Sequence, residues 1–232
     1  MKTIGLIGGM SWESTSHYYT ELNQGIKKAL GGLHSAKILM RSVDFGLIEK
    51  LQSKGDWESL GNIMAGAAQK LEKGGADFLL ICANTMHKLA PRVVDAVNIP
   101  LLHIADATAE VLLGDNIKKV GLLGTAYTME QTFYKDRLTT KFDLDVIIPD
   151  KTDRELVHTI IYKELCLGKI TDPSKKAYIN IAENLVQKGA QGIILGCTEI
   201  AMLLKQEDID IPLYDTTKIH AAKAVQWALE DE

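Results

Sequence analysis

Short runs rich in Ile, Leu and Val recur along the chain and alternate with longer segments whose apolar residues follow helical spacing. The apolar runs occupy residues 2–8, 36–44, 77–82, 118–124, 143–148 and 191–197. Such runs are typical of buried parallel strands, and the segments between them would supply helical crossovers. The segment from Trp57 to Gly75 stops at paired glycines, which predicts a helix with a glycine C-terminus. The pattern predicts an α/β fold.

The chain also resembles itself. The segment GADFLLICANT, which begins at Gly75, aligns with GAQGIILGCTE, which begins at Gly189, at an offset of 114 residues (189 − 75). At nearly the same separation, TIGLIGG aligns with KVGLLGT and NIPLLHIADAT aligns with DIPLYDTTKIH. Three matches in one order indicate an internal duplication into two similar α/β halves.

The duplication predicts two pseudo-symmetric domains, each a mostly parallel sheet flanked by helices, with an active site in the cleft between them. We expect residues 1–100 plus 211–232 to form the N-terminal domain and residues 101–210 to form the C-terminal domain. No Pro/Gly/Ser-rich linker divides the chain.

The repeat also sets the register of the cysteines. At the offset of 114, Ala83 is the counterpart of Cys197, whereas Cys82 corresponds to Gly196. Because side chains alternate faces along a strand, a shift of one residue points a side chain the opposite way. If this register continues to the strand ends, Cys197 faces the cleft and Cys82 faces the core.

Composition and charge narrow the classes of partner. The net charge of −4 without a basic stripe gives a nucleic acid no surface to bind. No apolar run is long enough to cross a bilayer, and the first residues lack the pattern of a secretory signal, so we expect a cytoplasmic protein. Three widely spaced cysteines make a disulfide framework improbable, and without a C-x-x-C or H-E-x-x-H motif we expect no metal site.

Polar residues follow the predicted strands in the segments GGMSWES, ANTMH, GTAYTM and GCTEI. Ligands of open parallel sheets bind at the carboxyl ends of the strands, where helix N-termini offer N–H groups to an anion. We therefore expect a small anionic substrate. Asn84, Thr85 and Thr198 can also cap helices, and capping is compatible with ligand binding.

Cys197 follows a glycine at a strand-to-helix turn, where a helix N-terminus would lower its pKa and make the thiolate available as base or nucleophile. Cys166 lies in a helix-like segment and is expected to be a small buried hydrophobe. Glu199 either favours the helix dipole or is the partner of a base. His87 follows the ANTM turn and is expected to cap or pack.

The sequence resembles the aspartate/glutamate racemase family, whose members work without pyridoxal phosphate. The resemblance covers the whole chain and rests on the motifs IGLIGGMSWEST, GGLHSA, LICANTMHK, LHIADAT, GLLGTAYTM, IYKELCLGKI and ILGCTEI. It implies two similar α/β domains, a homodimer, an acidic amino-acid substrate and no cofactor.

In that family, two residues, usually both cysteines, stand on opposite sides of the substrate Cα and exchange its proton. The resemblance implies that Cys197 is one acid/base. The residues that it implies for substrate binding lie at the strand ends: Met10, Ser11, Ala83, Asn84, Thr85, Thr125, Thr198 and Glu199. Gln52 could reach a second carboxylate, as could Arg41, Lys163 and Lys169, and the spacing does not choose among them.

The chain departs from the family at the first thiol, because the residue before Asn84 is Ala83 and the cysteine, Cys82, lies one position earlier. Three outcomes follow: Cys82 turns into the cleft as the second catalytic thiol, another group or a water returns the proton, or racemisation is weak or absent. The leading hypothesis is a cofactor-independent racemase of aspartate or glutamate. The alternatives are a single-thiol isomerase or decarboxylase of a small dicarboxylate, and a catalytically silent binding protein for an acidic amino acid.

Overall fold

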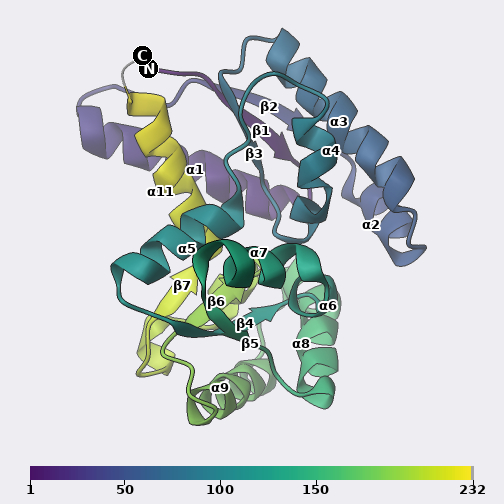
Figure 1. The fold of residues 1–232 in the computed structure, drawn as a ribbon, viewed down its shortest axis with the longest axis vertical. Helices are drawn as coiled ribbons and strands as arrows, with labels where there is room; N and C mark the ends of the chain where they lie inside the picture. The colour runs from purple at the N-terminus through teal and green to yellow at the C-terminus, as the bar shows by residue number, and fades with distance from the viewer. Residues whose placement is uncertain (231–232) are drawn as a thin grey trace. The chain divides into compact units, whose positions relative to one another are not determined.

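A computed structural model describes residues 1–230 of the chain. The fold divides into two compact units (Figure 1). Unit 1 comprises Met1–Ile104 and the C-terminal segment from Thr217 onward, and unit 2 comprises Ala105–Thr216. Each unit contains a parallel sheet flanked by helices, so the predicted α/β class is confirmed.

Unit 1 has a three-stranded sheet in the order β2-β1-β3, with every pairing parallel. Its elements are β1 (Ile4–Gly8), α1 (Trp12–Leu30), β2 (Ile38–Ser42), α2 (Phe45–Ser53), α3 (Trp57–Lys73), β3 (Phe78–Ile81), the 3₁₀ helix η1 (Thr85–Leu89), α4 (Ala90–Val94) and α11 (Thr216–Leu229). The predicted helix from Trp57 is confirmed, and Gly74 follows its last residue.

The two faces of this sheet bury two separate clusters because side chains alternate along β1 and β3. One cluster contains Leu6, Leu80 and Cys82 together with residues of α1 and α11. The other contains Ile7, Ile81 and residues of α3, with Ala83 packed against it. Consecutive residues at the end of β3 therefore belong to opposite faces, as the register predicted.

Unit 2 has a four-stranded parallel sheet in the order β5-β4-β6-β7. Its elements are α5 (Ile104–Gly114), β4 (Lys119–Gly124), α6 (Ala126–Glu130), α7 (Thr132–Phe142), β5 (Asp145–Ile147), α8 (Lys151–Lys163), η2 (Leu165–Leu167), α9 (Asp172–Gln187), β6 (Ile193–Gly196), α10 (Ile200–Leu203), η3 (Gln206–Asp208) and β7 (Leu213–Asp215).

The strand pairings reproduce the duplication that the sequence indicated. In unit 1, Ile7 of β1 pairs with Ile81 of β3, and in unit 2, Leu123 of β4 pairs with Leu195 of β6. These pairs match at the sequence offsets of 116 (123 − 7) and 114 (195 − 81). The ends of β3 and β6 are thus structurally equivalent positions in two sheets.

The unit boundaries lie a few residues later than predicted on both crossings. Leu102 packs in the core of unit 1, and Leu101 bridges to Leu79 of β3, so the first crossing comes after residue 104 and not after residue 100. The second crossing follows residue 216, because β7 pairs with β6 in unit 2. A boundary after residue 210 would separate β7 from its sheet. The sequence had not predicted β7, which is three residues long.

Candidate functional site

The end of β3 carries Cys82 into the core of unit 1. Cys82 is completely buried in the cluster that α1 and α11 share, and burial raises the pKa of its thiol well above the ordinary value. Its carbonyl oxygen accepts a hydrogen bond of 3.2 Å from the Ser14 hydroxyl of α1. These surroundings contradict the prediction of Cys82 as a second catalytic thiol, because strand alternation points its sulfur at apolar side chains.

The next three residues form the polar turn of this strand end. Ala83 is partly buried, and Asn84 and Thr85 are buried as the chain enters η1. Both side chains lie where the sequence predicted carboxylate-binding groups, at the carboxyl end of a parallel strand. The backbone of Asn84 already has helical torsion angles, φ −66° and ψ −52°.

The end of β1 lies one strand away and forms a tight turn. Gly9 has a φ of 89°, and a side chain there would meet the backbone of Val43, so only glycine fits. The amide of Gly9 donates to the Thr15 hydroxyl at 2.7 Å. Ser11 caps α1 by accepting a hydrogen bond from the amide of Ser14 at 3.2 Å. Met10, between Gly9 and Ser11, is buried, so the turn at the carboxyl end of β1 is well packed.

Gln52 of α2 is a buried amide with unused hydrogen-bonding capacity. Its side chain is 4% exposed, and its Nε2 has no hydrogen-bond partner among the residues that the structure describes. A buried amide donor left unpaired costs about 1–3 kcal/mol, so the Nε2 of Gln52 is a candidate donor for a bound acceptor.

In unit 2, the end of β6 carries the thiol that unit 1 lacks at the equivalent position. The Cys197 side chain is half-buried, and its Sγ donates a hydrogen bond of 2.9 Å to Oε2 of Glu199, which is 6% exposed. Thr198, between the two, is also buried. Glu199 is therefore the partner of the thiol and not merely a first-turn acid.

This arrangement reverses the expected shift in the pKa of Cys197. Burial, the negative Glu199 carboxylate and the Cys166 thiol raise the pKa of Cys197 well above the ordinary value, although a backbone hydrogen bond from Glu199 acts in the opposite direction. The expectation of a lowered pKa is wrong because α10, which follows, spans four residues and offers little dipole. The resting group is a protonated thiol.

The surroundings of Cys197 include a second thiol and a buried phenol. Cys166 lies in η2, which contacts α10, and its side chain is half-buried. Tyr178 of α9 is fully buried and donates a 3.0 Å hydrogen bond to the carbonyl of Val157. Burial raises the pKa of Tyr178 well above its ordinary value, with Cys197 and Cys166 contributing. The Tyr178 hydroxyl therefore stays protonated at neutral pH.

Thr125 follows β4 and caps α6, because its hydroxyl accepts from the amide of Thr128 at 3.3 Å. The next amide, of Ala126, donates to Nδ1 of His158 on α8 at 3.1 Å. Burial lowers the pKa of His158, while the carboxylate of Glu130 opposes that shift, so the ring stays a neutral acceptor. The sequence analysis missed His158, whose i+32 separation from Ala126 gives no local signal.

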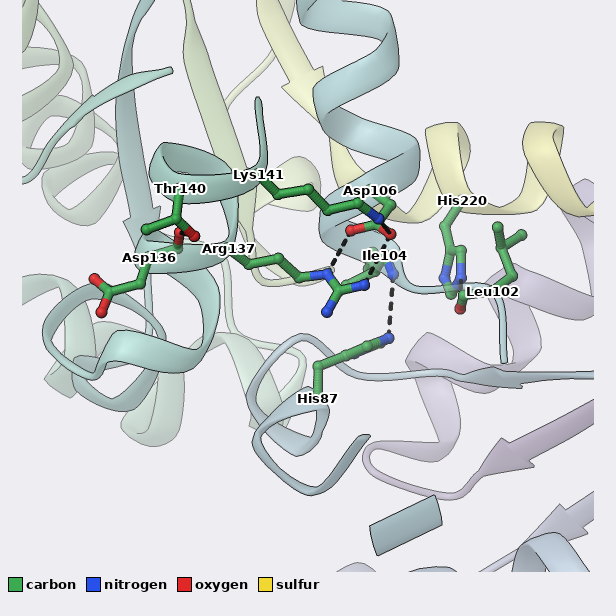
Figure 2. Close-up of polar contacts among 9 residues, drawn as sticks. All are labelled: His87, Leu102, Ile104, Asp106, Asp136, Arg137, Thr140, Lys141 and His220. Carbon is green, nitrogen blue, oxygen red and sulfur yellow. Dashed lines mark hydrogen bonds and ion pairs between the residues drawn. The ribbon is translucent and has the colours of Figure 1, made fainter. Parts of the chain in front are cut away.

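A second unpredicted cluster lies at the start of α5 in unit 2. Arg137 and Lys141 of α7 both bind the carboxylate of Asp106, with Nη2 of Arg137 at 2.8 Å and Nζ of Lys141 at 2.6 Å (Figure 2). Burial alone would raise the pKa of Asp106, but hydrogen bonds from the two cations lower it. The triad fastens α5 to α7, so these charges are structural partners.

Unit 2 also contains a cavity of about 330 Å³ that includes none of the predicted site residues. It lies against α9 and residues 207–211, and its acidic lining is Glu183, Glu207, Asp208 and Asp210. Four carboxylates repel an acidic substrate, so this cavity is a poor candidate for its binding.

Within residues 1–230, no group of three or more His, Cys, Asp or Glu side chains could hold a metal ion. None of the helices described for this chain is both long and apolar enough to span a membrane.

Comparison with known proteins gives a consistent assignment. The family model for Asp/Glu/hydantoin racemase matches residues 7–224. The crystal structure of a Yersinia pestis protein proposed to be an Asp/Glu racemase is 54% identical, has a TM-score of 0.94 and covers 99% of this chain and 100% of that one. An aspartate racemase homologue from Pyrococcus horikoshii is 34% identical, with a TM-score of 0.86 over 99% of this chain and 100% of its own.

A broad-specificity amino-acid racemase of Bacillus subtilis is 22% identical over 238 residues, covering 97% of this chain and 98% of that protein. The match with the family model and these relatives confirm the resemblance drawn from the motifs. This chain belongs to the Asp/Glu/hydantoin racemase family.

Proposed function

We propose that the protein is a cofactor-independent racemase of aspartate or glutamate in which Cys197 carries the Cα proton. The observation that carries this proposal is the Cys197–Glu199 pair at the end of β6, with 2.9 Å between Sγ and Oε2. A nucleophile or base held against a second ionisable group is the recurring arrangement of proton-transfer sites. Family membership supplies the class of reaction.

The raised pKa of Cys197 suits this chemistry in both directions. As a thiol, Cys197 is ready to give a proton to a carbanion. To act as base it passes its proton to Glu199, the acceptor already in place, and burial keeps the resulting thiolate basic. Since the Cα proton of an amino acid is weakly acidic, a stronger base gains driving force at the expense of a smaller ionised fraction.

The donors at the strand ends have the second role, which is to hold the substrate's carboxylates. We assign the α-carboxylate to the turns of unit 1 that carry Met10, Ser11, Asn84 and Thr85. Negative charge that develops next to a carboxylate is stabilised by preorganised N–H and O–H donors. The buried Nε2 of Gln52 is suited to a side-chain carboxylate, which explains why a buried amide keeps an unused donor.

The proposal leaves one face of the substrate without a thiol of the chain. Ala83 has no titratable atom, and the sulfur of Cys82 lies in the core. Proton return on that face then falls to a water molecule or another group, so we expect racemisation to be slow compared with Cα exchange. The same observation favours a second candidate, a single-thiol decarboxylase or isomerase of a small dicarboxylate.

The test is to incubate the protein in deuterium oxide with each enantiomer of aspartate and glutamate. Proton NMR follows loss of the Cα signal, and chiral chromatography follows the opposite enantiomer. The racemase proposal predicts both, with the first faster than the second. Decarboxylated product from a dicarboxylic acid would favour the second candidate. Thermal stabilisation by aspartate with no Cα exchange would identify a binding protein and contradict both enzymatic proposals.

We also propose that the protein is a cytoplasmic homodimer that binds neither nucleic acid nor membrane. This rests on the net charge of −4 and on the family resemblance. Sedimentation of the purified protein tests the assembly, and a monomer at micromolar concentration would contradict it.

A further inference from the structure

Three histidines lie together in the interior of unit 1. The side chains of His87, His103 and His220 are 1%, 6% and 0% exposed. The ring of His87 has its centroid 4.6 Å from that of His103 and 5.8 Å from that of His220. Burial of several ionisable rings side by side is costly unless each is neutral and hydrogen-bonded. The hydrogen-bond partners of each ring therefore indicate its role in the fold.

His87 joins two backbone segments that are far apart in the sequence. Its Nδ1 lies 2.8 Å from the carbonyl oxygen of Ala83, and the amide of Ile104 donates to its Nε2 at 3.2 Å (Figure 2 shows the second contact). A carbonyl only accepts and an amide N–H only donates, so Nδ1 carries the proton and Nε2 does not. One neutral tautomer satisfies both partners.

His220 is fixed in the opposite tautomer. Its Nε2–H donates to the carbonyl of Leu102 at 3.0 Å, and the hydroxyl of Tyr18 donates to its Nδ1 at 2.8 Å. Burial, and to a smaller extent the neighbouring His87, lowers the pKa of His220 to about 3. The rings of His220 and His103 both face His87. His87 and His220 together hold the segment that contains residues 102–104, through the amide of Ile104 and the carbonyl of Leu102.

The Ala83 contact gives His87 a role beyond packing. Ala83 directly precedes Asn84, and the bond from Nδ1–H holds the carbonyl of the peptide that joins them. An apolar side chain of similar volume would fill the space and leave that carbonyl and the amide of Ile104 buried without their partner. The bond thus fixes the direction in which the turn leaves β3.

We propose that neutral His87 is a positioning residue that orients the Ala83–Asn84 peptide, and with it the Asn84 side chain, for an acidic substrate. The proposal rests on the proposed function, since it assigns Asn84 to a carboxylate of that substrate. His87 acts through Asn84, because the imidazole itself bonds to the backbone of the turn.

Two matched variants separate the bonds of His87. The amide nitrogen of Asn lies near the position of Nδ1, so His87→Asn can keep the bond to Ala83 and lose the one to Ile104. The side-chain oxygen of Gln lies near the position of Nε2, so His87→Gln can keep the bond to Ile104 and lose the one to Ala83. We expect His87→Gln to raise KM for aspartate roughly tenfold and His87→Asn to raise it no more than about threefold. For both variants kcat should change less than KM, because Cys197 keeps its partner.

Equal effects of the two variants on KM, or no effect of either, would overturn the proposal. Aspartate binding measured by calorimetry gives the same comparison without any catalysis. If Cα exchange is absent in the wild type but His87→Gln still weakens aspartate binding more than His87→Asn, the proposed function fails and the positioning role stands.

Should neither variant fold, the wild type still decides. Nitrogen-15 NMR of labelled histidine distinguishes the two tautomers. The proposal predicts a His87 ring protonated on Nδ1 that remains neutral at pH 6. The Nε2–H tautomer, or a charged ring at that pH, would contradict it.

Discussion

The ends of β3 and β6 occupy the same place in two duplicated sheets, yet they differ in where they carry sulfur. Ile81 and Leu195 hold the same register in their sheets. Beyond them, Cys82 enters the core of unit 1, whereas Cys197 is half-buried and bonds to Glu199. A displacement of one residue along the strand places a thiol in the core instead of at the polar strand end, because the two positions face opposite sides of the sheet.

Gly196 occupies the position in unit 2 that corresponds to Cys82, and its surroundings explain why unit 2 has no cysteine there. A side chain at Gly196 would lie 2.9 Å from the carbonyl of Leu123 and 3.0 Å from the side chain of Leu122, so that face of β6 is too close to β4 for a sulfur. Unit 1 has room for Cys82 on the same face. Duplicated strands can therefore keep one register while only one of them carries a thiol outside the core.

The largest effect is expected when Ala83 is changed to Cys. This substitution restores a thiol at the counterpart of Cys197, which in two-thiol members of the family is the second acid/base. Racemisation of aspartate should rise roughly a hundredfold or more, the range that a positioned acid or base contributes. Chiral chromatography measures the gain, and Ala83→Ser is the matched control that lacks an acidic group. If the Ala83→Cys protein folds but racemises aspartate no faster than the wild type, the ends of β3 and β6 are not functionally equivalent.

A second difference, between the two units, predicts how their stability responds to acid. His220 in unit 1 has a pKa of about 3 in the folded state against an ordinary value of 6.5. The unfolded chain takes up this proton first, so stability is unaffected above pH 6.5 and falls as the pH drops from 6.5 toward 3. Between pH 6.5 and 5 the loss is about 2 kcal/mol.

Urea denaturation at several pH values measures this loss, and His220→Phe should flatten the pH dependence although it lowers stability at neutral pH. Hydrogen exchange should show unit 1 opening before unit 2 as the pH falls. Equal slopes for the wild type and His220→Phe would show that His220 is not the group responsible.

A smaller effect is expected at the end of β6 when Glu199 is changed to Gln. After burial, the Glu199 carboxylate is the next cause that raises the pKa of Cys197, so its neutralisation should lower that pKa. The pH dependence of alkylation by iodoacetamide reports the thiolate, and both proteins should carry Cys166→Ala so that one half-buried thiol remains. A midpoint that stays in place or moves upward would separate Glu199 from the thiol.

The smallest effect on activity is expected for Cys82→Ala. Removal of a buried sulfur leaves a small cavity and should cost roughly 1 kcal/mol of stability. Thermal denaturation should show a modest decrease in Tm. The rate of Cα exchange should stay within about twofold of the wild type, because Cys82 has no acid/base role in this account. A loss of exchange much larger than the loss of stability would return Cys82 to the chemistry.

Strand alternation and the internal repeat account for what the sequence could predict. The apolar runs located β1 to β6, and the repeat offset alone predicts that Cys82 and Cys197 point to opposite faces of their sheets. β7 escaped prediction because a strand of three residues carries too little pattern to be distinguished from a loop.

The electrostatics of the site could not be predicted from the sequence in the same way. A turn before a helix suggested a lowered thiol pKa, but burial and the Glu199 carboxylate raise the pKa of Cys197, and α10 is too short to offset them. The bonds of His87 and His158 join segments 17 and 32 residues apart, and no local pattern reports them. Such contacts depend on tertiary packing, which cannot be inferred from short sequence patterns.

The most direct measurement compares Cα–H exchange of aspartate in deuterium oxide for the wild type, Cys197→Ala and Cys82→Ala. Our account predicts that Cys197→Ala loses exchange by roughly a thousandfold while remaining folded, and that Cys82→Ala keeps it. Exchange that survives the loss of Cys197, or that disappears with Cys82 alone, would contradict the assignment of the reactive thiol to the end of β6.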